Sequence, residues 1–131
     1  MNTKLNKILA EISAGELIDK ITILEIKKDK IDDSEKLEEV RKELNSLNKT
    51  LKKFIEKNNA INKYINELKN INLKLWDIED GKRIAEKNNK FDAHFIELAR
   101  NVYKFNDKRA QIKLKINQEL GSSIKEVKSY D

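Results

Sequence analysis

Apolar residues recur along this chain at alternating spacings of three and four, and this pattern constrains the fold more than any other feature. Between residues 37 and 54 the recurring positions are Leu37, Val40, Leu44, Leu47, Leu51 and Phe54. Because an α-helix turns once every 3.6 residues, these positions form one stripe, and a sustained heptad seam is typical of helices that pack side by side. Similar stripes run through residues 14–31, 61–85 and 91–120. We therefore predict an all-α protein.

Helix-capping residues separate the stripes. Residues 13–16 (SAGE) have the pattern of a capping box, in which Ser13 accepts from the amide of Glu16 and the glutamate reaches back, so the first helix should begin near Ala14. Residues 32–35 (DDSE) precede the second helix, and residues 88–90 (NNK) form a turn before a last helix over about 91–120. Gly121 follows at the position of a C-cap glycine.

One boundary stays open at this stage. The seam over residues 34–88 fits one continuous helix, or two helices that are separated by a turn at Asn58-Asn59. We favour the break, because asparagine adopts left-handed turn geometry more easily than most residues.

Four amphipathic segments with short polar turns predict an antiparallel helical bundle of three to four helices with coiled-coil-like packing. We expect residues 1–131 to form a single helical domain, with an N-terminal arm over 1–12, the bundle over 13–120 and an extended C-terminal tail over 121–131. The alternative is an elongated two-stranded rod, in which the first and last helices lie end to end along one long partner. Such a rod would leave its stripe half exposed and should dimerise.

Composition excludes several classes of function. The chain has no cysteine and only one histidine, His94, so disulfide scaffolds, thiol catalysis and thiolate or His-rich metal sites are excluded. No apolar run reaches the roughly 18 residues of a membrane helix, and we expect a soluble, cytoplasmic protein without membrane contact. The net charge of +5 comes mostly from lysines with acids interleaved, which makes nucleic acid an unfavoured partner. No P-loop, glycine-rich cradle or Ser/His/Asp arrangement is present, and we expect no cofactor.

A second group of residues departs from the simple apolar stripe. On the third segment, polar and aromatic residues at spacings of three and four form a second row, which lies next to the apolar row on the helix surface. On the last helix, a stripe that contains both polar and apolar residues lies beside the apolar stripe. Arg109 interrupts that apolar stripe, and the first helix adds charges beside Leu17 and Ile18. The resulting candidate ligand-binding residues are Glu16, Asp19, Lys20, Trp76, Glu79, Asp80, Arg83, Glu86, Asp92, Arg100, Tyr103, Asn106, Arg109 and Lys113.

Two interpretations of this group compete. In the first, the charges form ion pairs that flank the core, among them Glu79 with Arg83 at i,i+4, which contributes about 0.3–0.5 kcal/mol. In the second, Arg83, Arg100, Arg109 and Lys113 present cations to an anionic ligand in a pocket between helices. A carboxylate metal site is not expected, because the Glu-x-x-His pairs of di-iron bundles are missing.

Several motifs resemble an uncharacterised bacterial and viral family, domain of unknown function 6165. Two of them are the continuous stretches 15–27 (GELIDKITILEIK) and 75–80 (LWDIED). The others are the pairs and short runs FD, FI, LAR and VY within 91–103, ND, RA, IK and IN within 106–117, GS at 121–122 and EVKSY at 126–130. The resemblance spans nearly the whole chain, least over 30–70, and Gly81 departs from the bulkier residue expected there. It implies a helical fold and no established activity, and relatives beside surface-polysaccharide genes suggest a link to that metabolism. Residues 105–113 are also similar to the first-helix signature of all-helical chorismate mutases, although the order of the remaining helices does not follow that family.

For function, we expect a non-enzymatic protein–protein interaction module that associates with itself as a homo-oligomer or with a protein partner. The long seams and the lack of a catalytic arrangement favour it. The alternative is a small protein or enzyme that binds an anionic metabolite between its helices through arginine, lysine and carboxylate side chains.

Overall fold

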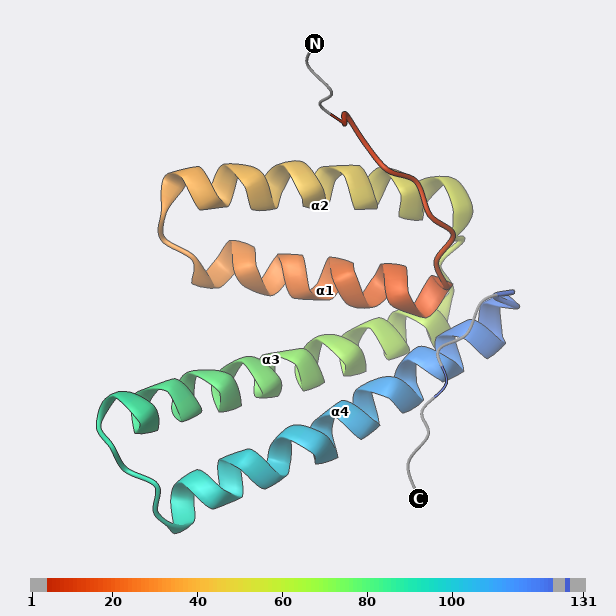
Figure 1. The fold of residues 1–131 in the computed structure, drawn as a ribbon. Coiled ribbons are helices and arrows are strands. Elements are labelled where there is room, and N and C mark those ends of the chain that lie inside the picture. Colours follow the sequence, from red (N-terminus) through yellow and green to blue (C-terminus); the bar gives the residue numbers. More distant parts are fainter. Residues whose placement is uncertain (1–4, 124–126, 128–131) are drawn as a thin grey trace.

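The computed structural model describes residues 5–123 and residue 127, and four α-helices account for most of them. They are α1 (Ala14–Lys30), α2 (Ser34–Phe54), α3 (Asn59–Lys87) and α4 (Ala93–Leu120), and no strand occurs among these residues. The helices pack against one another as two antiparallel hairpins, α1–α2 and α3–α4 (Figure 1). The predicted all-α bundle is confirmed.

The helix ends follow the predicted caps, with one difference in mechanism. Ser13 Oγ accepts from the Glu16 amide at 3.1 Å, and Gly121 adopts a left-handed conformation with φ of 64° at the end of α4. The break before α3 is confirmed, but Asn58 is not a left-handed turn residue. Its backbone is extended, with φ of −127°, and its side chain accepts from the Ile61 amide at 2.9 Å. The asparagine therefore begins α3 as its N-cap, whereas α2 ends at Phe54 with Ile55 as the C-cap.

Helix α1 is the centre of the molecule, because it packs against α2 on one side and against both α3 and α4 on the other. Its buried side chains Leu17, Ile18, Ile21 and Leu24 join one core cluster with residues of the other three helices, among them Leu44, Leu68 and Ile116. Helix α2 lies on the far side of α1 from the α3–α4 hairpin (Figure 1). The position of α1 thus decides which part of that hairpin is covered.

The α3–α4 hairpin extends well beyond α1. At 1.5 Å per residue, the 17 residues of α1 span about 25 Å, whereas the 29 and 28 residues of α3 and α4 span about 43 Å. All the buried residues of α4 lie in its second half, namely Ile112, Lys113, Ile116 and Asn117. We call residues 83–103 the distal part of the hairpin. It is two helices thick, and Ile84, Phe91, Ile96 and Tyr103 are exposed there.

The ends of the chain are simpler. Residues 5–12 have no regular secondary structure and are exposed. The predicted extended tail over 121–131 lies largely outside the described residues, beyond Ser123. No helix in the described part of the chain has the length and apolar character needed to cross a membrane.

Candidate functional site

The carboxylate of Asp19 is buried where α1 meets α3 and α4. Asp19 is 0% exposed. Arg109 on α4 binds its carboxylate through two hydrogen bonds: Nε donates to Oδ1 at 2.9 Å, and Nη2 donates to Oδ2. Arg109 Nη1 also donates to Asn106 Oδ1 at 3.3 Å. A planar guanidinium matches a carboxylate in this two-pronged way, so the pair fixes orientation as well as charge.

Helix α3 joins the same group through Asn72. Its Nδ2 donates to Asp19 Oδ1 and to Thr22 Oγ1, both at 2.9 Å, and Thr22 Oγ1 donates to the Asp19 carbonyl at 2.8 Å. We call Asp19, Thr22, Asn72 and Arg109 the Asp19 cluster. Every buried side-chain nitrogen and oxygen in the described part of the chain has a hydrogen-bond partner. A satisfied polar cluster between three helices fixes how they pack.

Lys113 lies one helical turn beyond Arg109 and is almost fully buried. Its Nζ donates to Glu16 Oε2 at 2.7 Å and lies 4.0 Å from Asp19 Oδ2. The predicted capping box is therefore only half formed, because the Glu16 carboxylate pairs with Lys113 on α4 instead of its own helix terminus. The two carboxylates and two cations at this contact balance in charge, which a buried ionic group requires.

The first turn of α1 approaches α4 closely. The Gly15 amide donates to Asn117 Oδ1 at 2.7 Å, and the Ala14 amide donates to Ser122 Oγ at 3.2 Å. A Cβ on Gly15 would lie 2.5 Å from the Lys113 carbonyl oxygen, which is too short for any real contact. Glycine at this position is what lets the two backbones approach.

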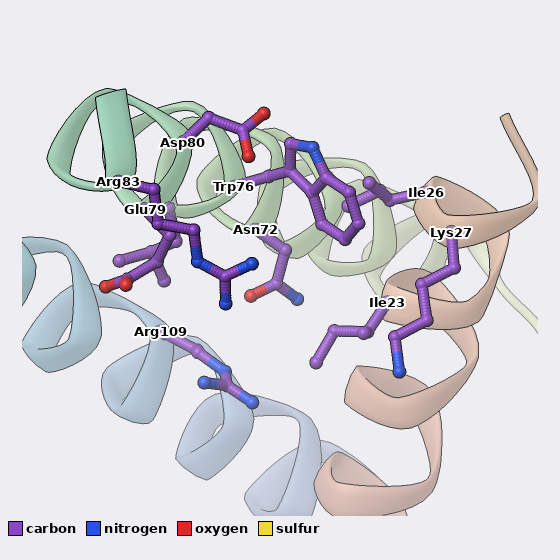
Figure 2. Close-up of a pocket in the computed structure, with 10 residues that line it drawn as sticks. Ile23, Ile26, Lys27, Asn72, Trp76, Glu79, Asp80, Arg83 and Arg109 are labelled. Atoms are coloured by element: carbon purple, nitrogen blue, oxygen red, sulfur yellow. The ribbon is translucent and has the colours of Figure 1, made fainter. Parts of the chain in front are cut away.

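A pocket of about 400 Å³ adjoins the Asp19 cluster and lies between the C-terminal half of α1, the middle of α3 and one residue of α4 (Figure 2). Its lining residues are Ile23, Ile26, Lys27, Asn72, Leu75, Trp76, Glu79, Asp80, Arg83 and Arg109. Arg109 and Asn72 belong to both the cluster and the pocket. The cluster therefore holds part of the pocket wall in place.

The lining combines an aromatic surface with positive charge. The half-buried ring of Trp76 lies beside Ile26, and the Arg83 guanidinium extends toward Asn72 and Arg109 (Figure 2). Within residues 5–123, neither Lys27 nor Arg83 forms an ion pair. Two cations thus face the pocket without a carboxylate of their own.

The predicted ion pair between Glu79 and Arg83 is not formed. Glu79 Oε1 instead lies 3.3 Å from Lys82 Nζ, at i,i+3. The Arg83 side chain turns over the pocket, away from the i,i+4 geometry that the pair would need (Figure 2). The prediction was wrong because it considered residue spacing along one helix alone. It could not take into account a neighbouring cavity into which the long Arg83 side chain extends.

The structure separates the fourteen predicted residues into three groups and one further residue, Lys20. Trp76, Glu79, Asp80, Arg83 and Arg109 line the pocket, and Glu16, Asp19, Asn106 and Lys113 lie in the ion pairs and hydrogen bonds around Asp19. Lys20 is exposed, with Nζ 4.0 Å from Glu16 Oε1. Glu86, Asp92, Arg100 and Tyr103 lie in neither place; Asp92 is the N-cap of α4, and Arg100 lies in a separate groove.

Comparison with known proteins gives a family and no activity. Residues 8–131 match DUF6165, a family of unknown function. The chain belongs to this family. No curated protein and no solved structure matches the chain. Because DUF6165 has no known function, a function can be inferred only from the geometry of the site.

Sequence reasoning missed Lys27, Thr22 and Asn72 as members of this region. Asn72 carried a detectable signal, because it is a polar residue on an otherwise apolar heptad seam, where a single asparagine often fixes helix register. Lys27 could not be recognised from the sequence, because it is one of many lysines in a chain with 28 basic residues. Only the tertiary contact shows that it borders a pocket.

Proposed function

We propose that this protein binds a small anionic ligand, carrying phosphate or carboxylate groups, in the pocket beside Trp76. One observation supports the proposal above the others: cationic side chains from three helices, Lys27, Arg83 and Arg109, border the same cavity. The volume, about 400 Å³, lies within the range of pockets that hold small molecules.

The cations have different roles in this proposal. The Arg109 guanidinium is already held by Asp19, so it shapes the wall and its charge is largely balanced. Arg83 and Lys27 supply the charge that attracts the ligand, with the flat fork of Arg83 suited to two oxygens of one phosphate or carboxylate. The Trp76 ring offers a surface on which the carbon part of the ligand can lie.

Two acidic residues at the pocket narrow the range of ligands. Glu79 is paired with Lys82, whereas Asp80 has no ion-pair partner within residues 5–123. A carboxylate accepts hydrogen bonds from hydroxyl or amine groups, so the favoured ligand carries such donors in addition to its anionic group.

Isothermal titration calorimetry with pyrophosphate and citrate at constant ionic strength tests the proposal. We expect saturable binding to the native chain, and at least a tenfold loss in affinity for Arg83→Gln and for Lys27→Gln, about 1.4 kcal/mol each. Lys28→Gln is the matched control, because Lys28 is exposed on the next position of α1 and does not line the pocket. Absence of binding at millimolar anion, or equal affinity in all four proteins, contradicts the proposal.

A second candidate function is that of a self-associating interaction module. It is favoured by the apolar side chains Ile96 and Tyr103, which are exposed on the outer face of α4 in the distal part of the hairpin.

A further inference from the structure

The first half of α4 carries a groove that is built from one helix alone. Its volume is about 460 Å³, and it is lined by Ala93, Ile96, Glu97, Arg100, Asn101 and Lys104. None of these residues lines the pocket beside Trp76. A groove along a single helix is the kind of surface into which the side-chain ridge of another helix packs.

The sequence positions of these six residues are symmetric about the midpoint of the groove. When the order is reversed, Ala93 exchanges with Lys104, Ile96 with Asn101, and Glu97 with Arg100. An antiparallel second α4 therefore presents the same six positions in matching order. In an interface with two-fold symmetry each such pair occurs twice, since the same patch serves both copies.

The charges agree with this arrangement. In the antiparallel register, Glu97 of each copy faces Arg100 of the other, which gives two ion pairs of opposite sign. Within one chain, neither side chain has an ion-pair partner among residues 5–123, although both are exposed and three positions apart. Complementary charge of this kind selects a partner and its register.

No other helix of the described chain covers this face of α4. Helix α1 ends before it, and no residue of α4 before Ile112 is buried. Ile96 is 55% exposed and Tyr103, at the edge of the same region, is 56% exposed. A helix laid along the groove would remove both apolar side chains from water, which favours association.

We infer that a second copy of this chain docks here, with the two α4 helices antiparallel across the groove at residues 93–104. The contact is about 18 Å long at 1.5 Å per residue and smaller than a standard stable interface, so the dimer forms reversibly with concentration. It leaves the ligand pocket open in both copies. The inference therefore stands or falls independently of the proposed ligand.

A charge-reversal experiment tests the register directly by sedimentation velocity. Glu97→Arg places arginine against arginine across the interface, and Arg100→Glu places glutamate against glutamate, so each variant alone should sediment as a monomer of 15.4 kDa. An equimolar mixture of the two restores opposite charges at both pairs and should sediment as a dimer. The native chain should shift from monomer to dimer over roughly 10–500 μM, the range for a small interface.

The matched control uses Glu38 and Arg41, an exposed pair of the same spacing on α2. Glu38→Arg and Arg41→Glu should leave the monomer–dimer shift unchanged, and far-ultraviolet circular dichroism should show that all variants keep their helices. A native chain that stays monomeric across the range overturns the inference. So does a dimer that both single reversals at Glu97 and Arg100 leave intact, or a mixture that fails to associate.

Discussion

Asp19 on α1 and Arg109 on α4, 90 positions apart in the sequence, form a two-pronged ion pair at the point where α1 meets the long hairpin. The Asp19 side chain is fully buried, whereas the Arg109 side chain is 28% exposed and borders the Trp76 pocket. One pair thus connects the position of α1 in the core to the shape of the pocket. A buried pair of this kind adds less to stability than apolar packing would, but losing one member is costly.

Replacing Arg109 should therefore destabilise the protein strongly. Arg109→Met leaves the Asp19 carboxylate buried without its guanidinium, and we expect the free energy of unfolding to fall by about 3–5 kcal/mol. The double variant Asp19→Leu/Arg109→Met removes both charges and should recover at least half of the loss. Urea unfolding measures both, with the exposed Arg41→Met as control; a loss below about 1 kcal/mol for Arg109→Met would contradict the assigned role.

Asn72 tests whether the polar interruption of the α3 seam is structural. Asn72→Leu restores an apolar seam but removes the donor to Asp19 Oδ1 and Thr22 Oγ1, so we expect a loss of about 1–3 kcal/mol in place of a gain. Asn70→Leu, exposed on the same helix, should change stability by less than about 0.5 kcal/mol. If thermal or urea unfolding shows Asn72→Leu to be the more stable protein, the Asp19 cluster does not depend on the amide.

The same substitution should destabilise the protein strongly at one glycine and hardly at all at another. Gly15→Ala brings a Cβ to 2.5 Å from the Lys113 carbonyl, a backbone atom that cannot move by itself. We expect α1 to shift on α4, with a loss of about 2–3 kcal/mol in urea unfolding.

Gly81→Ala is the contrasting substitution. Its nearest neighbours would be side-chain atoms of Leu98, with Cδ1 closest at 3.0 Å, and this flexible side chain can give way. A gain in helix propensity of about 1 kcal/mol then offsets the tight contact, so stability should stay within about 1 kcal/mol of the native chain. Equal losses for Gly15→Ala and Gly81→Ala would show that the close approach of α1 to α4 is not specific.

The helix boundaries could be predicted because they depend on local chemistry. Ser13 and Gly121 act within a few residues of their own position, as the sequence predicts. Asn58 also acts locally, but as the N-cap of α3 and not as the left-handed turn that was expected. Arg109 was also conspicuous, because a cation interrupts an apolar stripe only where it finds a buried partner or solvent. Which of the 23 acidic residues that partner is depends on where α1 lies along the hairpin, and no local pattern specifies that register.

The pocket was only partly predictable for the same reason. Trp76, Glu79 and Arg83 follow one another along one face of α3, so their grouping could be expected from spacing. Arg100 was expected with them, but it lies on the outer face of α4, because its direction depends on how α4 is rotated against α3. Lys27 enters the site only because α1 ends beside Trp76.

The intrinsic fluorescence of Trp76 tests the proposed pocket most directly, since this is the single tryptophan of the chain and it lines the cavity. The protein is titrated with pyrophosphate while sodium chloride holds the ionic strength constant. We predict a saturable change in intensity or emission maximum for the native chain and for Lys28→Gln, and its loss in Arg83→Gln. No change up to roughly 10 mM pyrophosphate, where even a weak site would fill, or the same titration curve in Arg83→Gln, would contradict the account.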